Sequence, residues 1–204
     1  MRSPNLNLGF FASHNGTGMR AVVKAIRSGV LLANPKVVIS NNASAPALDF
    51  ASENRIAAFH VSQRALGADR DLDAELLRIL VSQEVDIIVL SGYLRKLGPK
   101  ILRHFGGSIL NVHPSLLPKF GGKGMYGAKV HRAVLDAGET ESGATVHLVE
   151  AEYDSSKTIC QKEVSVAPGE TPETLARSVE SIEGDLLIEA LNKIAKNSMP
   201  LTAI

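Results

Sequence analysis

The sequence predicts an α/β protein with a Rossmann-like, mostly parallel and twisted sheet, flanked by helices, and with an antiparallel edge in its C-terminal part. Up to residue 112, short apolar runs alternate with segments of helical periodicity. Strands that alternate with helices favour a parallel sheet with both faces covered. In the C-terminal part, two strand-like runs follow each other without a helix between them, which is typical of an antiparallel pair.

The strands expected in the first half are short and dominated by apolar residues: Leu6–Ala12, Lys36–Ser40, Ala57–His60, Asp86–Leu90 and Ser108–Val112. The helices expected between them carry their apolar residues on one face: Met19–Ser28, Ala45–Glu53, Leu72–Gln83 and Pro99–Phe105. Gly29 stands at the stop position of the first helix, and Pro99 in the first turn of the last.

The second half begins with a loop at 114–127, which is rich in Pro and Gly. It continues with a helix, two antiparallel strands and a long terminal helix: Lys129–Ala137, Ala144–Val149, Thr158–Val166 and Thr171–Ala195. Thr171 is the expected N-cap of the last helix. We expect one domain over residues 1–204, with a nucleotide-binding-type half at 1–113 and a catalytic part at 114–204.

Composition and charge narrow the functional class. Of 204 residues, 22 are Lys or Arg and 21 are Asp or Glu, so the net charge is +1. That balance argues against a protein that coats nucleic acid or a basic membrane-binding surface. Cys160 is the single cysteine, which excludes an intrachain disulfide and a zinc site built from cysteines. No apolar run has the length of a membrane span and no signal peptide is evident, so we expect a cytoplasmic protein with a small-molecule partner.

The loop Ser13–Gly18 follows the first strand and opens the first helix. Its glycines would let backbone N–H groups approach an anion, and the helix dipole favours a phosphate there. The alternative is a plain strand-to-helix turn in which Thr17 or Asn15 caps the helix.

Asn111 and His113 stand two residues apart at the end of a buried strand, before Pro114. That spacing places both side chains on one side of the strand. His113 suits a general acid or base near neutral pH, and Asn111 suits a donor to a developing oxyanion. The alternative is a buried histidine bonded to backbone, with the proline only ending the strand.

Acidic residues follow the strand Ala144–Val149, over the run from Glu150 to Asp154. Asp154 could orient His113 and raise its pKa through its charge. The alternative is a solvated acidic loop.

The segment Ser91–Pro99 also follows a strand and mixes apolar with basic groups. It could hold a flat aromatic ligand, or it could be a loop with solvated charges. The histidines other than His113 lack metal-ligand spacing, so we expect no metal.

The run from Asn111 to Pro118 closely resembles the Asn-x-His-Pro-Ser-Leu-Leu-Pro signature of the folate-dependent formyltransferases. The resemblance covers roughly residues 7–190. It implies the formyltransferase fold and a transfer of the formyl group from 10-formyltetrahydrofolate to the amine of glycinamide ribonucleotide, with no metal. The protein would be a monomer or a homodimer and would bind no nucleic acid and no membrane.

Site residues follow from this resemblance, position by position. Asn111, His113 and Asp154 match the catalytic trio, in which the carboxylate keeps the histidine cationic. Matches to the acceptor site are Asn15, Gly16, Thr17, Gly18 and Glu183. Matches to the folate site are Arg70, Leu94, Arg95, Lys96, Leu97, Asn111, Glu150, Ala151, Glu152 and Tyr153, of which Arg70 requires a one-residue gap.

The sequence also departs from the family pattern. Gly18 replaces a usual asparagine, which removes one phosphate ligand and keeps the backbone N–H. Ser155 and Ser156 replace glycines that permit unusual backbone angles. The loop Phe120–Lys129 is longer than usual and is either a lid or an exposed loop.

Three other functions stay open at this point. A formyltetrahydrofolate hydrolase would carry an added N-terminal domain, and a methionyl-tRNA formyltransferase would carry an added C-terminal domain and a basic face. We expect neither domain in a chain of this length and charge. An inactive folate- or nucleotide-binding homologue is the third, supported by Ser155 and Ser156 and opposed by the presence of the catalytic trio.

Overall fold

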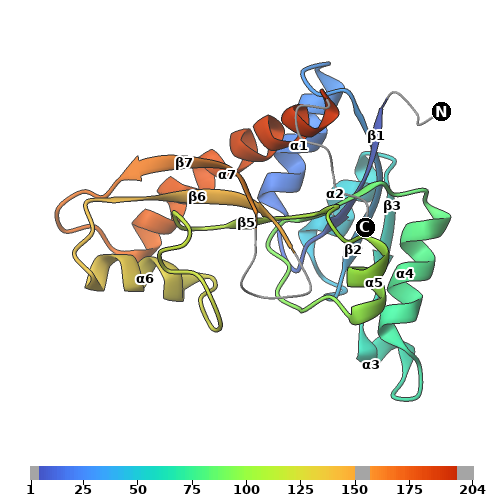
Figure 1. The fold of residues 1–204 in the computed structure, drawn as a ribbon. Helices are drawn as coiled ribbons and strands as arrows, with labels where there is room; N and C mark the ends of the chain where they lie inside the picture. Colours follow the sequence, from blue (N-terminus) through green and yellow to red (C-terminus); the bar gives the residue numbers. More distant parts are fainter. Residues whose placement is uncertain (1–4, 150–156, 197–204) are drawn as a thin grey trace.

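The computed structural model describes residues 5–149 and 157–196, and in these ranges the chain forms a seven-stranded sheet with helices on both faces (Figure 1). The strand order is β3-β2-β1-β4-β5-β6-β7. The first five strands pair in parallel, while β6 is antiparallel to both β5 and β7. The predicted fold class is therefore confirmed.

The element bounds follow the sequence-based expectations closely. The strands are β1 (Leu6–Phe11), β2 (Ala33–Ser40), β3 (Ala57–His60), β4 (Ile87–Leu90), β5 (Ile109–His113), β6 (Glu141–Leu148) and β7 (Thr158–Ser165). The helices are α1 (Thr17–Arg27), α2 (Pro46–Glu53), α3 (Gln63–Leu66), α4 (Leu72–Ser82), α5 (Pro99–His104), α6 (Ala128–Asp136) and α7 (Pro172–Ala195).

Three elements differ from the prediction, and one of them is β6, which begins at Glu141 where Ala144 was expected. Strand β2 begins at Ala33, because the Asn-Pro dipeptide before Lys36 pairs with β1 although neither residue favours a strand. Helix α3 was not predicted, since four residues are too few to show helical periodicity. Its cap is Ser62, whose Oγ accepts a hydrogen bond from the Ala65 N–H at 3.2 Å.

Successive strand residues point into two different cores. Phe10 and Val38 pack on the face that α1 and α7 cover. Their neighbours Phe11 and Ile39 pack on the opposite face, against residues of α4 and α5. Burial on both faces explains why the parallel strands are almost continuously apolar.

Helix α7 packs closely along α1, and small residues make this possible (Figure 1). A Cβ atom on Gly184 would lie 2.5 Å from the Ala21 Cβ, and one on Gly18 would lie 2.7 Å from the Leu187 Cδ1. The departure at Gly18 thus has a packing counterpart, since a side chain there would have to displace buried Leu187. The close approach brings the middle of α7 to the start of α1.

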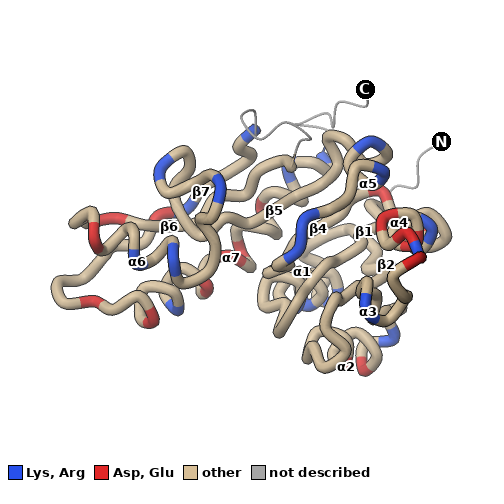
Figure 2. Tube along the Cα trace, turned by 90° about the horizontal axis from the view of Figure 1, so that it is seen from below, with Lys and Arg blue, Asp and Glu red and all other residues tan. Residues whose placement is uncertain are grey.

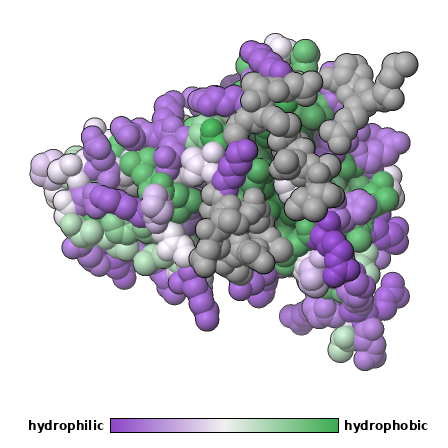
Figure 3. Space-filling model, viewed as in Figure 1, coloured by the Kyte–Doolittle hydropathy of each residue, from purple (hydrophilic) through white to green (hydrophobic). Residues whose placement is uncertain are grey.

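Charge is spread over the described chain without one dominant sign (Figure 2). The face viewed in Figure 3 carries mostly hydrophilic side chains, with smaller hydrophobic patches between them. Within residues 5–149 and 157–196, no helix combines the length and the apolar character that a membrane crossing needs.

Candidate functional site

The connections of neighbouring strands diverge at the carboxyl end of the sheet. Strands β1 and β4 are neighbours, but the chain leaves β1 toward α1 on one face and β4 toward α5 on the other. Ligands of open α/β sheets bind where the connections diverge in this way. The 13–16 and 91–98 loops leave the sheet at this point, and the end of β5 lies next to β4.

Ser13 connects the loops that follow β1, β2 and β4 through its hydrogen bonds. Its Oγ donates to the Asn41 Oδ1 at 2.6 Å and accepts from the Leu94 N–H at 2.9 Å. Its backbone N–H donates to the Gly92 carbonyl at 3.1 Å. The side chain is 2% exposed, so these bonds are shielded from water and hold the loops after β1, β2 and β4 in fixed relative positions.

The start of α1 has the form expected of an anion-binding loop. Gly16 is the N-cap residue and has φ 61°, a left-handed conformation that favours glycine. Neither Thr17 nor Asn15 caps the helix through its side chain, so the alternative of a side-chain-capped turn is wrong. The Met19 N–H donates to the Ser91 Oγ at 3.0 Å. No described residue accepts from the N–H groups of Thr17 and Gly18.

Asn111 contacts a histidine that sequence reasoning left out of the site. Its Nδ2 donates to the Nε2 of His147 on β6 at 3.1 Å. The His147 Nδ1 lies 3.2 Å from the Leu148 carbonyl, which can only accept, so the proton is on Nδ1 and Nε2 is the acceptor. The contact fixes the rotation of the Asn111 amide and leaves one Nδ2–H for a ligand.

His113 lies two residues beyond Asn111, on the same side of β5. Its Nε2 donates to the Phe120 carbonyl at 2.8 Å. Burial lowers the pKa of His113 below its usual value, and the bond to Phe120 opposes that effect only partly. Burial likewise lowers the pKa of His131 and His147, and the His113 charge adds to both effects.

The loop after His113 is held in place by β6. Thr145 is fully buried, and its Oγ1 donates to the Ser115 carbonyl at 2.6 Å and accepts from the Leu117 N–H at 3.0 Å. Gln161 Nε2 also donates to the Thr145 Oγ1, at 2.8 Å. Tertiary hydrogen bonds, as well as the prolines, therefore fix this segment.

Glu183 of α7 is partly buried beside α1. Burial, and then the nearby charge of Glu180, raise its pKa to about 7. Glu180 itself accepts a hydrogen bond from the Thr17 Oγ1 at 2.6 Å. The structure thus brings Glu183, predicted from the far end of the sequence, to the helix that begins with the predicted residues Thr17 and Gly18.

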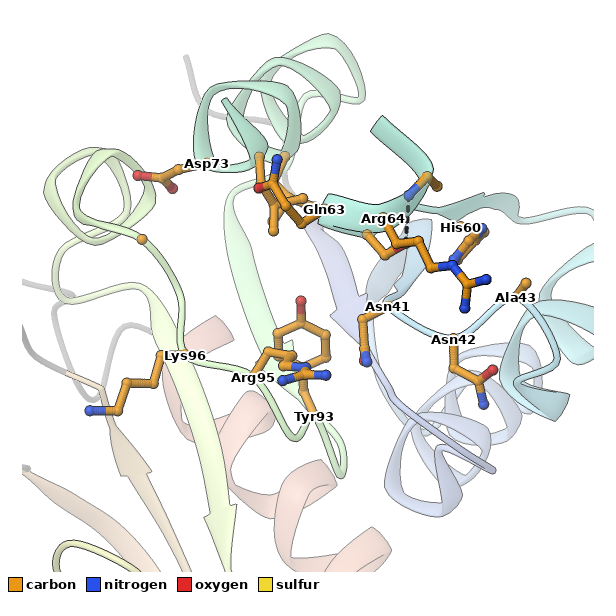
Figure 4. Close-up of a pocket in the computed structure, with 15 residues that line it drawn as sticks. Asn41, Asn42, Ala43, His60, Gln63, Arg64, Asp73, Tyr93, Arg95 and Lys96 are labelled. Carbon is orange, nitrogen blue, oxygen red and sulfur yellow. Dashed lines mark hydrogen bonds between the residues drawn. The ribbon is translucent and has the colours of Figure 1, made fainter. Parts of the chain in front are cut away.

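A cavity of about 990 Å³ lies beside the 91–98 loop (Figure 4). Four segments line it, from the loop after β2, from β3 to α3, from α4 and from the 91–98 loop: Asn41–Ala43, His60 and Ser62–Ala65, Leu72, Asp73 and Leu76, and Tyr93, Arg95, Lys96 and Gly98. The Tyr93 ring packs edge-on against Phe11 at 5.0 Å between centroids, and its hydroxyl points into the cavity in Figure 4. Basic side chains outnumber acidic ones in this lining, which suits an anionic ligand.

Of the predicted folate residues, Arg95 and Lys96 line this cavity. Leu94 is exposed, and Leu97 packs against the core under α4 and α5. Arg70 is exposed on the loop between α3 and α4 and does not line the cavity, whereas Arg64 does line it.

The predicted residues Glu150, Ala151, Glu152, Tyr153 and Asp154 lie outside the described residues, as do Ser155 and Ser156. Within the described ranges, no cluster of three or more His, Cys, Asp or Glu side chains is arranged to hold a metal ion.

Signals for the missed residues exist in the sequence. His147 is a polar residue within an apolar strand, and Asn41 and His60 stand where strands end, which are the positions at which α/β proteins place ligand contacts. Only the strand register shows which of these positions face one another.

Comparison with known proteins gives a consistent result. The sequence profile of the Formyl transferase family matches residues 6–191. A phosphoribosylglycinamide formyltransferase of Escherichia coli is 32% identical over 178 residues, which are 87% of this chain and 82% of that protein. A chloroplastic phosphoribosylglycinamide formyltransferase of Arabidopsis thaliana is 35% identical over 93% of this chain, which spans only 65% of the plant protein.

Solved structures agree. A glycinamide ribonucleotide transformylase of Symbiobacterium toebii superposes with a TM-score of 0.88 and 33% identity, over 96% of this chain and 90% of that one.

Proposed function

The chain belongs to the Formyl transferase family, and on that premise we propose that it transfers the formyl group of 10-formyltetrahydrofolate to the amine of glycinamide ribonucleotide. The products would be formylglycinamide ribonucleotide and tetrahydrofolate, in purine biosynthesis. The names of the E. coli and A. thaliana relatives support this substrate pair. The observation that carries the proposal is the pair Asn111 and His113, held at the end of β5 with hydrogen-bonding capacity left for a ligand.

The folate donor supplies an activated formyl carbon. The acceptor amine attacks that carbon, its C=O bond becomes a C–O⁻ oxyanion, and the C–N bond to the folate then breaks as the folate nitrogen gains a proton and the amine loses one. The second Nδ2–H of Asn111 donates to the oxyanion. Protonated His113 holds the Phe120 carbonyl through Nε2, which leaves its Nδ1–H for the oxyanion or for the proton transfer.

Asp154 is the third member of the proposed trio. The described surroundings of His113 lower its pKa, because burial favours the neutral ring. A carboxylate close to the ring would restore the cationic form at neutral pH. We assign that role to Asp154, from the family resemblance alone.

Substrate binding divides between the two sides of the 91–98 loop. Asn15, Gly16, Thr17 and Gly18 bind the acceptor phosphate through backbone N–H groups, and Glu183 contacts the ribose. Folate contacts are assigned to Arg70, Leu94, Arg95, Lys96, Leu97 and Asn111, and to Glu150, Ala151, Glu152 and Tyr153. The cavity suits the carboxylates of the folate tail, because Arg64 and Arg95 border it.

One assay tests the proposal against its alternatives. Purified protein is mixed with 10-formyltetrahydrofolate, with and without glycinamide ribonucleotide, and the release of tetrahydrofolate is followed. We expect release that depends on the acceptor. Release without acceptor would indicate a hydrolase, a function known for a fold neighbour from Pseudomonas syringae that is 24% identical. No release in either mixture would indicate a binding protein.

We place the reaction in the cytoplasm and take the protein to be a monomer or a homodimer in which residues 1–113 and 114–204 act as one unit. The single cysteine fits a reducing compartment. Cell fractionation and sedimentation equilibrium test these two statements.

A further inference from the structure

A carboxylate from α7 lies at the start of α1. The Thr17 hydroxyl donates to the Glu180 Oε1 at 2.6 Å, a bond that joins residues 163 positions apart in the chain. Hydrogen bonds to a carboxylate are shorter and stronger than those between neutral groups. Thr17 is the first residue of α1, so Glu180 supplies a negative charge at the positive end of the helix dipole.

The same place offers donors to an external anion. The N–H groups of Thr17 and Gly18 have no acceptor among the described residues. Gly16 adopts a left-handed conformation that opens the turn in front of them. A phosphate bound by these donors would lie within a few ångströms of the Thr17 hydroxyl and therefore of the carboxylate that this hydroxyl holds.

Two described charged groups lie near this turn, Glu183 on α7 and Arg20 on α1, and Arg20 keeps its positive charge in its bonds to neutral carbonyls. Glu183 lies one turn further along α7, and the Glu180 charge contributes to its raised pKa, so the two carboxylates interact. Arg20 is the nearby cation, but its Nε donates to the Asn15 carbonyl and its Nη2 to the Pro46 carbonyl, both at 2.8 Å. The guanidinium also stacks on Phe50, with 4.5 Å between the Arg20 Cζ and the ring centroid.

We propose that Glu180 is a specificity-determining residue that weakens the binding of phosphorylated acceptors, because its carboxylate competes with the phosphate for the Thr17 hydroxyl and repels it. The inference rests on the proposed function, which places the acceptor phosphate at residues 15–18. Two like charges a few ångströms apart in a water-exposed setting repel enough to change an affinity about fivefold. Removing the Glu180 charge should strengthen phosphate binding by about that factor.

The test is a charge series at one position. Binding of ribose 5-phosphate, and of ribose as the uncharged reference, is measured by calorimetry for the wild type, Glu180→Gln and Glu180→Lys. The matched control is Asp185→Asn, the same loss of charge on the same helix, at an exposed residue that faces Lys162 of β7. Thermal unfolding of each variant shows that the fold is retained. Formyl-transfer kinetics with glycinamide ribonucleotide complete the set.

The proposal expects ribose 5-phosphate to bind about fivefold more tightly to Glu180→Gln than to the wild type, and more tightly still to Glu180→Lys. Ribose binding and the Asp185→Asn control should not change, added salt should shrink the difference, and KM for the acceptor should fall with little change in kcat. Unchanged or weaker binding of ribose 5-phosphate to Glu180→Gln overturns the proposal, as does the absence of binding in all variants. If no protein in the series transfers formyl groups, the proposed function fails, while the calorimetric series still decides the role of Glu180.

Discussion

Asn111 and His147 are direct cross-strand partners in the antiparallel β5–β6 pair, and the Asn111 Nδ2 lies 3.1 Å from the His147 Nε2. The antiparallel pairing of β5 and β6 thus places His147 against the candidate catalytic residue Asn111. Because the Leu148 carbonyl fixes the His147 tautomer, the imidazole presents an acceptor, and the Asn111 amide is oriented before any ligand arrives.

Substituting His147→Ala should therefore slow the reaction without weakening substrate binding much. Loss of one orienting hydrogen bond corresponds to about 1 kcal/mol, so we expect kcat to fall about fivefold and both KM values to change little. His104→Ala on α5 is the matched control. Steady-state kinetics of both variants check the prediction, and an unchanged kcat in His147→Ala would show that the contact does not position Asn111.

Thr145→Val should destabilise the segment that follows His113. The substitution keeps the side-chain volume but leaves the Ser115 carbonyl, the Leu117 N–H and the Gln161 amide without the Thr145 hydroxyl. Unpaired buried polar groups cost about 1–3 kcal/mol, so urea unfolding should show a loss of this size. Glu141→Gln, at the exposed start of the same strand, is the control and should leave the free energy of unfolding unchanged. A loss below about 0.5 kcal/mol would mean that the three partners find other bonds.

Asp154→Asn should lower the rate at neutral pH while the fold survives. The described surroundings hold the pKa of His113 below its ordinary value, so without the carboxylate the cationic form declines at a lower pH. At a pH above the His113 pKa, each further unit by which that pKa falls lowers the fraction of cationic His113 about tenfold. The profile of kcat/KM against pH should move to lower pH in the variant. An unchanged profile would remove Asp154 from the mechanism.

Glu183→Gln should change the pH dependence of stability. The folded-state pKa of Glu183, about 7, lies above its ordinary value of 4.5. The protonated carboxyl therefore favours the folded state at low pH, and this contribution is lost as the pH rises through 7. When the pH rises from 5 to 8.5, we expect the free energy of unfolding of the variant to increase by up to about 3 kcal/mol relative to that of the wild type. Urea unfolding of both proteins at pH 5 and at pH 8.5 measures this change. If the difference in unfolding free energy between variant and wild type is the same at the two pH values, the raised pKa is contradicted.

The sequence was a good guide to elements whose signal is local. Thr171 and Pro172 marked the start of α7, and the structure has the capping box there. The apolar runs located β1 and β4 because both faces of these strands are buried. Contacts between distant segments had no such signal. The hydroxyl of Thr17 bonds to Glu180 and that of Ser13 to Asn41, and both pairings depend on strand order and helix packing rather than on spacing.

Arg95→Gln should weaken the binding of the folate donor and leave the binding of the acceptor unchanged. Arg95 borders the cavity of about 990 Å³. A guanidinium that pairs with a carboxylate at a partly exposed site contributes about 1 kcal/mol, so KM for 10-formyltetrahydrofolate should rise about fivefold and more at low salt. The control is Arg177→Gln on α7, across the sheet. If KM for glycinamide ribonucleotide rises instead, the cavity belongs to the acceptor, and the division of the substrates between the two sides of the 91–98 loop must be reversed.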